Sequence, residues 1–202
     1  PAERLKPVLD LFTETALEIG DGQQLDMEFE KRTDVTEDEY IEMIRLKTSV
    51  LLACALKIGA ILAGASEEDA DNLYRFGEKI GLAFQLQDDY LDVYGDEKVF
   101  GKAIGGDILE GKQTYLMITA ISRADEPTRE VLRSTHRSQM PDAEKIATIK
   151  AVYDRLDIPR LTEQQISLRF ERALGILDTL SVEKSRTERM REYALSLMGR
   201  KN

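Results

Sequence analysis

The chain has 202 residues, 42% of them hydrophobic and 33% charged, a balance typical of a soluble domain that can bury a core. Its net charge of −10 argues against nucleic acid or an anionic membrane as a partner, because both favour a basic face. No run of about 18 apolar residues predicts a membrane span or anchor. The single cysteine, Cys54, excludes an internal disulfide and indicates a reducing, cytoplasmic compartment.

The N-terminal elements are predicted to be helices. Residues 3–30 repeat apolar side chains about every 3.6 positions, and Gly20 and Gly22 interrupt the pattern. A second helix begins after Thr36, where Glu39 completes a capping box, and it continues to residue 64.

The remaining elements are also predicted to be helices. A third helix runs from Ser66 to about Tyr94, and a glycine-rich loop covers residues 95–111. Later helices are expected at residues 106–122, 127–134, 141–156, 162–180 and 183–198. Alternating strand patterns are absent, so the sequence predicts an all-α fold of long antiparallel helices, with residues 1–202 as a single domain.

The segment FQLQDDYLDVYGD, residues 84–96, places carboxylates among apolar residues. On a helix, Gln85, Asp88 and Asp92 share one face, and Asp89 lies about a quarter turn away. Carboxylates one turn apart repel each other, whereas Mg²⁺ would reverse the sign because it takes one or two carboxylates together with waters and phosphate oxygens. A solvated acidic helix face is the alternative interpretation.

The loop that follows reads VFGKAIGGDILEGKQT and carries groups suited to an anion. Lys102 and Lys112 are candidate anion ligands, and Asp107 is a further candidate on the metal side. Glycines allow the backbone to approach a ligand closely: Gly101, Gly105 and Gly106. The alternatives are a solvated loop lysine at residue 102 and a helix N-cap at Asp107.

Two further polar patches lie upstream. In IEMIRLKTSVLL, Lys47 and Thr48 stand inside an apolar helix, where a lysine often extends to solvent and a threonine often bonds to its own helix. In GDGQQLDMEFE, Gln23 and Asp26 lie one turn apart. The only histidine, His136, lies in a polar stretch and is predicted to be a surface residue.

Taken in their order along the chain, these four segments resemble the motifs of the trans-isoprenyl diphosphate synthases, the polyprenyl synthetase family. FQLQDDYLDVYGD with FGKAIGGDILEGKQT is similar to the second aspartate-rich motif and its loop. GDGQQLDMEF resembles the Gly-Gln-x-x-Asp segment, and RLKTSVLL resembles the Lys-Thr helix. The resemblance covers about residues 8–180 and implies an isoprenoid-synthase-type helical bundle around a central cavity.

The resemblance also implies a reaction and roles for residues. An allylic diphosphate ionises, isopentenyl diphosphate attacks the cation, and Mg²⁺ bridges to the leaving diphosphate. The implied metal ligands are Asp88, Asp92, Asp89 and Asp107. The implied catalytic residues are Lys47, Thr48, Gln85 and Lys102. The residues implied to bind substrate are Lys47, Lys102, Lys112, Gln23 and Asp26. The departing diphosphate would take the proton, so no histidine base is needed.

The sequence departs from the family pattern in one important respect. The first aspartate-rich motif is absent, since Asp88–Asp89 is the only Asp-Asp pair. We therefore expect the chain to correspond to the C-terminal part of a larger synthase domain and to be inactive alone. The family is typically homodimeric, and apolar positions that could form such an interface are Leu51, Leu52, Ile58 and Leu62.

Other functions remain open. A terpene cyclase or squalene-synthase-like enzyme would also use a helical fold and an acidic Mg²⁺ motif. A regulatory subunit of the same fold would need neither the acidic residues nor the lysines, so their retention argues against it. A helical bundle with chance acidic faces is the third alternative.

Overall fold

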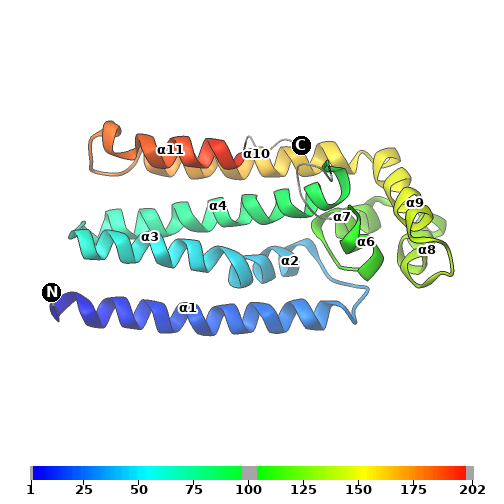
Figure 1. Cartoon of the computed structure of the whole chain (residues 1–202), viewed down its shortest axis with the longest axis horizontal. Coiled ribbons are helices and arrows are strands. Elements are labelled where there is room, and N and C mark those ends of the chain that lie inside the picture. The colour runs from blue at the N-terminus through cyan, green and yellow to red at the C-terminus, as the bar shows by residue number, and fades with distance from the viewer. Residues whose placement is uncertain (1, 97–103, 199–202) are drawn as a thin grey trace. The chain divides into compact units, whose positions relative to one another are not determined.

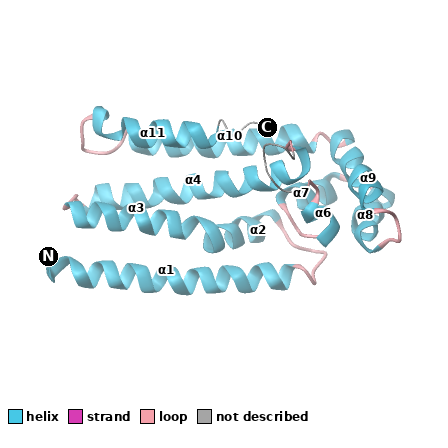
Figure 2. Cartoon of the chain, viewed as in Figure 1, coloured by secondary structure: helices cyan, strands magenta, loops and turns pink. Residues whose placement is uncertain are grey.

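The computed structural model describes residues 2–96 and 104–198, and within them every regular element is a helix (Figures 1 and 2). The elements are α1 (Ala2–Phe29), α2 (Glu37–Ile44), the π-helix η1 (Arg45–Ser49), α3 (Val50–Ala63), α4 (Glu67–Tyr94), α6 (Gly106–Glu110), α7 (Tyr115–Arg123), α8 (Glu126–Ser134), the 3₁₀-helix η2 (Thr135–Arg137), α9 (Asp142–Arg155), α10 (Ile158–Leu177) and α11 (Lys184–Met198). The prediction of an all-α fold is confirmed.

Several predicted helix boundaries differ from the structure. Helix α1 continues through Gly20 and Gly22 without a break. The helix predicted from Thr36 to Gly64 contains the π-helix η1, which a 3.6-residue pattern does not reveal. The helix predicted at residues 106–122 is two helices, α6 and α7, because Gly111 adopts φ of +69° and ends α6.

The capping box predicted at the start of α2 is confirmed. The Thr36 backbone N–H and hydroxyl each donate to Glu39 Oε2 at 2.9 Å, and the Glu39 N–H donates back to Thr36 Oγ1 at 3.3 Å. Arg32 adds a hydrogen bond from its Nη1 to Glu39 Oε1 at 2.7 Å. The local sequence therefore determines where α2 begins.

The described chain divides into two compact units. The first contains residues 2–25, 41–85 and 167–198, and the second contains residues 26–40, 86–96 and 104–166. This division does not test the expectation that residues 1–202 form a single domain, which stays a prediction.

The first unit contains antiparallel helices. The guanidinium of Arg4, near the start of α1, donates to the carbonyl of Leu62 at the end of α3 at 2.5 Å. A Cβ added to Gly22, late in α1, would lie 2.8 Å from Leu46, before the start of α3. Helices α1 and α3 therefore run in opposite directions, as the sequence predicts. Cys54 is buried in this unit and is a small core residue.

The second unit is organised around its own apolar core. The side chains buried there come from the end of α4 and from α6 to α10: Val93, Ile108, Leu116, Met117, Ala120, Ala124, Leu132, Ile149, Val152, Tyr153 and Ile158. This core holds the short helix α6 against α9 and against the last turns of α4. The acidic end of α4 is thereby attached to a packed scaffold.

One helical stretch meets the length and hydropathy criteria for a membrane span. It covers Glu37–Ala63, and 33% of its most apolar window is buried in the structure. The core helix of a soluble protein meets the same criteria, so this is weak evidence. The expectation that the chain has no membrane span or anchor stays a prediction.

Candidate active site

The end of helix α4 and the start of α6 are joined through Asp92. The Asp92 carboxylate accepts a hydrogen bond from the Asp107 backbone N–H at 3.1 Å, and the Asp92 carbonyl accepts one from the Gly105 N–H at 2.6 Å. Gly105 has φ of +85°, and a Cβ there would lie 2.6 Å from the Ile146 side chain. Only glycine therefore allows the chain to turn here and bring Asp107 beside Asp92.

The electrostatics of this corner are unfavourable for two ionised carboxylates. Burial and, to a lesser extent, the negative charge of Asp107 together raise the pKa of Asp92 to about 6. Asp107 is half-buried and pairs with Lys112, whose Nζ lies 2.9 Å from its Oδ1 and 2.8 Å from Glu110 Oε2. These contacts outweigh the burial that lowers the Lys112 pKa, so its pKa is raised overall.

Asp89 points into the protein. It is 6% exposed and accepts a hydrogen bond from the hydroxyl of Tyr40, which is 2% exposed. Burial raises the pKa of Tyr40, and the charges of Asp89, Asp107 and Asp26 raise it further. The buried hydroxyl of Tyr153 also has a raised pKa, first through burial and then through Asp107 and Asp89. The negative charges of Asp89 and Asp107 thus help to raise the pKa of two buried tyrosines in the second unit, Tyr40 and Tyr153.

In the first unit, glycines bring two helices close to the π-helix η1. A Cβ on Gly22 of α1 would lie 2.4 Å from the Lys47 backbone nitrogen. A Cβ on Gly81 of α4 would lie 2.6 Å from the Ser49 Cα. Both distances are shorter than side chains tolerate, so glycine is required on both sides of the Lys47–Thr48 segment.

The predicted polar pair on η1 and α4 is brought together. Thr48 Oγ1 donates a 3.1 Å hydrogen bond to Gln85 Oε1. The sequence raised the alternative that Thr48 bonds to its own helix, but this hydrogen bond leads to α4 instead. Lys47 is half-buried on η1.

The other predicted site residues occupy varied positions. Asp88 is half-buried on α4, one turn before Asp92, and Asp26 is half-buried near the end of α1. Gln23 is exposed on α1. Lys102 and Gly101 lie outside the described residues.

The donor chemistry of the second unit fits a hard divalent cation. Carboxylate oxygens of Asp88 and Asp92, with Asp107 close to Asp92, are the ligand type that Mg²⁺ prefers, and the mutual repulsion of Asp92 and Asp107 would be relieved by a cation. Within residues 2–96 and 104–198 no set of three or more His, Cys, Asp or Glu side chains is arranged to enclose an ion. In proteins Mg²⁺ commonly takes one or two carboxylates and completes its coordination with waters and phosphate oxygens.

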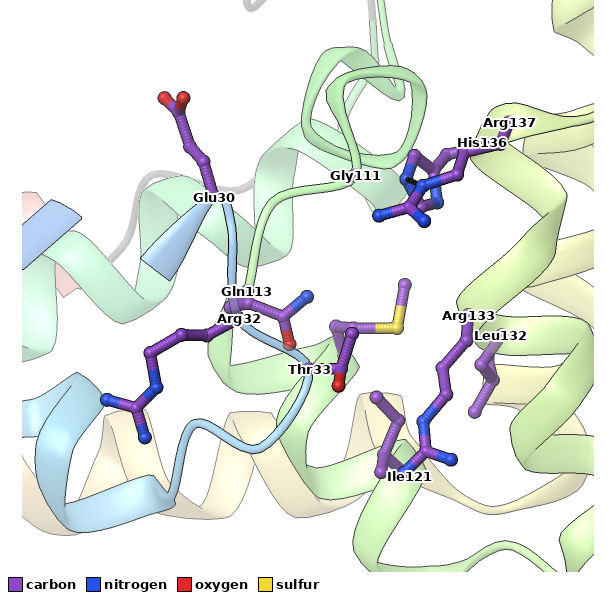
Figure 3. Close-up of a pocket in the computed structure, with 11 residues that line it drawn as sticks. Glu30, Arg32, Thr33, Gly111, Gln113, Ile121, Leu132, Arg133, His136 and Arg137 are labelled. Carbon is purple, nitrogen blue, oxygen red and sulfur yellow. Dashed lines mark hydrogen bonds between the residues drawn. The ribbon is translucent and has the colours of Figure 1, made fainter. Parts of the chain in front are cut away.

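Sequence reasoning missed three features. The buried tyrosines, Tyr40 and Tyr153, follow the same apolar periodicity as core residues, so no signal separates them from packing. The π-helix follows no hydrophobic pattern. His136, predicted to be a surface residue, is half-buried rather than fully exposed, and its close packing on Gly111 (Figure 3) was not predicted: a Cβ at Gly111 would lie 2.6 Å from His136 Cδ2.

Solved structures share this fold. A crystal structure of a geranylgeranyl pyrophosphate synthase superposes with a TM-score of 0.93 at 39% identity, covering 100% of this chain and 63% of that one. A geranylgeranyl pyrophosphate synthase from Corynebacterium glutamicum, complexed with isoprenyl diphosphate and magnesium, gives 0.89 at 32% identity and covers 100% of this chain and 57% of that one. The fold is that of the isoprenyl diphosphate synthases.

Sequence relatives agree with the structural comparison. The chain is 49% identical over 133 residues to a short chain isoprenyl diphosphate synthase of Methanothermobacter thermautotrophicus, covering 66% of this chain and 41% of that protein. It is 49% identical over 120 residues to a geranylgeranyl diphosphate synthase of Methanosarcina mazei, covering 59% and 37%. The chain thus spans less than half the length of these curated relatives.

The polyprenyl synthetase family model matches residues 3–156. The chain belongs to the polyprenyl synthetase family, and the resemblance drawn from its four motifs is confirmed.

Proposed function

We propose that this chain belongs to a Mg²⁺-dependent prenyltransferase that condenses an allylic diphosphate with isopentenyl diphosphate to a longer trans-polyprenyl diphosphate. The observation that carries the proposal is the corner of α4 and α6, where the half-buried Asp92 and Asp107 are joined by a hydrogen bond and where burial, followed by the charge of Asp107, raises the Asp92 pKa to about 6. The names of the relatives support chain elongation over cyclisation or head-to-head coupling.

The proposed metal ligands are Asp88 and Asp92, with Asp107 beside them. Bound Mg²⁺ would supply positive charge to the oxygens of the leaving diphosphate, which is where charge develops as the allylic bond breaks. Asp89 would act indirectly, because its carboxylate is buried and held by Tyr40.

The proposed diphosphate ligands are the lysines Lys47, Lys102 and Lys112. Lys112 is already oriented by Asp107 and Glu110, so its ammonium would be positioned before substrate binds. Gln23 and Asp26 are proposed to contribute to substrate binding from α1.

Thr48 and Gln85 are proposed to stabilise the allylic cation. Because the Thr48 hydroxyl donates a hydrogen bond to Gln85 Oε1, the lone pairs of Thr48 Oγ1 remain available to face positive charge. Neither side chain is basic enough to remove a proton from the cation, so the departing diphosphate is left to accept it.

The wider properties are also proposals. We propose that the active protein is a cytoplasmic homodimer, and the exposure of the apolar Leu51 and Leu62, each 52%, supports a partner surface on α3. We further propose that residues 1–202 alone do not turn over, since the first aspartate-rich motif is not among them.

The test uses inorganic diphosphate as a probe, with binding followed by titration calorimetry. Diphosphate should bind in the presence of Mg²⁺ and lose at least tenfold in affinity when EDTA replaces the metal. Asp88→Asn and Asp92→Asn should each weaken Mg²⁺-dependent binding at least tenfold, whereas Asp142→Asn, an exposed carboxylate on α9, should not. Metal-independent diphosphate binding that ignores both substitutions would overturn the proposal. A product assay with both substrates tests the prediction of inactivity.

A further inference from the structure

The π-helix η1 carries two residues of the proposed mechanism in the first unit. Lys47 is a proposed diphosphate ligand, and Thr48 donates a 3.1 Å hydrogen bond to Gln85 Oε1. Because an α-helix has 3.6 residues per turn, a change of one residue in register rotates each side chain by about 100° around the helix axis. Thr48 therefore meets Gln85 only while η1 keeps its register.

The backbone of η1 is packed closely on two sides. Gly22 of α1 and Gly81 of α4 lie so near it that neither position has room for a Cβ. These are van der Waals contacts, which depend on distance more than on direction. A directional contact is needed in addition to hold the register of η1.

Arg45, the first residue of η1, makes directional contacts with three other helices. Its Nε and Nη2 each donate a 2.8 Å hydrogen bond to the carboxylate of Glu42 on α2, in a forked pair. Its Nη1 and Nη2 donate at 3.3 Å to Glu18 Oε1 on α1, and Nη1 lies 3.5 Å from Glu78 Oε1 on α4. All four residues belong to the first unit. One guanidinium thus connects η1 to α1, α2 and α4.

The network around Arg45 is partly shielded from solvent. The exposed fraction of the side chain is 24% for Arg45, 32% for Glu18 and 19% for Glu78. The hydrogen bond from Arg45 lowers the pKa of Glu42, so this carboxyl is ionised at neutral pH. Three carboxylates share a single guanidinium, and its removal would leave like charges facing one another.

We propose that Arg45 is a positioning residue, whose contacts with the three glutamates hold the register of η1 and thereby place Lys47 and Thr48. The guanidinium is bound by carboxylates, so Arg45 acts through these two residues and leaves the diphosphate to Lys47. This role rests on the proposed function, because it matters for catalysis only if Lys47 and Thr48 act on the substrate.

Titration calorimetry of the full chain with Mg²⁺ and inorganic diphosphate tests this role in a double-mutant cycle. Arg45→Gln should weaken binding by about fivefold in the unmodified chain, but by less than about twofold in a chain that already carries Lys47→Met. Arg45→Lys should restore only part of the affinity, because an ammonium keeps the charge but lacks the fork. The control Arg160→Gln, whose arginine Nε donates to Asp157 at 2.7 Å on the same three-residue spacing, should leave the affinity unchanged.

A second double-mutant cycle uses thermal unfolding and needs no ligand. Thr48→Val removes the hydroxyl that donates to Gln85 and should lower the melting temperature of the unmodified chain. The same substitution should cause at most about half of that loss in the Arg45→Lys chain, because Thr48 would no longer be held facing Gln85. Arg45→Lys keeps the charge of the network, and far-ultraviolet circular dichroism establishes that each variant is folded.

Two results would overturn the role of Arg45. The first is an equal loss of diphosphate affinity from Arg45→Gln with and without Lys47, which a general loosening of the structure would produce. The second is an equal melting shift from Thr48→Val in both backgrounds, and this result decides the matter if the Lys47→Met chain binds too weakly to measure. Absence of any Mg²⁺-dependent diphosphate binding would instead refute the proposed function, while the thermal cycle would still judge Arg45.

Discussion

The hydroxyl of Tyr40 donates its hydrogen bond to the buried carboxylate of Asp89, in the middle of the acidic segment of α4. This contact gives the second aspartate of DDYLD a role inside the protein, distinct from that of its half-buried neighbours Asp88 and Asp92. A buried carboxylate needs such a donor, because an unmatched charge in the interior is costly.

Tyr40→Phe should lower the free energy of unfolding by about 2 kcal/mol, since it removes a hydrogen bond to a buried charged group. Urea unfolding followed by circular dichroism measures this. Tyr193→Phe is the matched control, because Tyr193 is 65% exposed and should change stability little. Equal effects of the two substitutions would show that the Tyr40 hydroxyl contributes no special stability.

Two glycines in α1 should respond oppositely to alanine. Gly20→Ala should stabilise the chain by about 0.5–1 kcal/mol, because a Cβ there meets nothing within 4 Å and alanine favours helix. Gly22→Ala should destabilise it by about 1–3 kcal/mol, since its Cβ would meet the Lys47 nitrogen at 2.4 Å. Thermal unfolding of both variants measures the difference. A stabilising Gly22→Ala would contradict the close packing of α1 on η1.

The capping box of α2 should make stability depend on acid pH. The Arg32 hydrogen bond, followed by those from Thr36, lowers the pKa of Glu39 to about 2. A carboxyl whose folded pKa is depressed contributes stability above its unfolded pKa of about 4.5, and this contribution is lost as pH falls toward 2.

Glu39→Gln should therefore lower the melting temperature at pH 6 and reduce the fall in melting temperature between pH 5 and pH 2.5. Circular dichroism melts over that range measure the effect. The exposed Glu130→Gln on α8 serves as the control. Parallel pH profiles for the Glu39 variant and the unmodified chain would refute this role.

Asp92→Asn should raise the melting temperature of the metal-free chain by about 2 °C, after allowance for solvent screening. The amide oxygen can still accept the hydrogen bond from the Asp107 N–H, while the charge that faces Asp107 is removed. Differential scanning calorimetry in EDTA measures the shift. A lower melting temperature would show that ionised Asp92 stabilises this corner even without a cation.

The sequence alone determined the fold class, most helix boundaries, the α2 capping box and the family. Apolar periodicity, capping residues and glycines at helix ends act locally, so they are readable without knowing which segments meet. The motifs are also local, because each lies on one helix or one loop.

Only the tertiary structure decided the pairings: Thr48 with Gln85, Tyr40 with Asp89, Asp92 with Asp107, and His136 with Gly111. These contacts join residues 15 or more positions apart, or depend on a glycine with positive φ, and helical periodicity carries no information about either. The π-helix at Lys47 is likewise packed closely against Gly22 and Gly81, which the sequence pattern does not reveal. Long-range packing, rather than local propensity, determines what each of these polar groups touches.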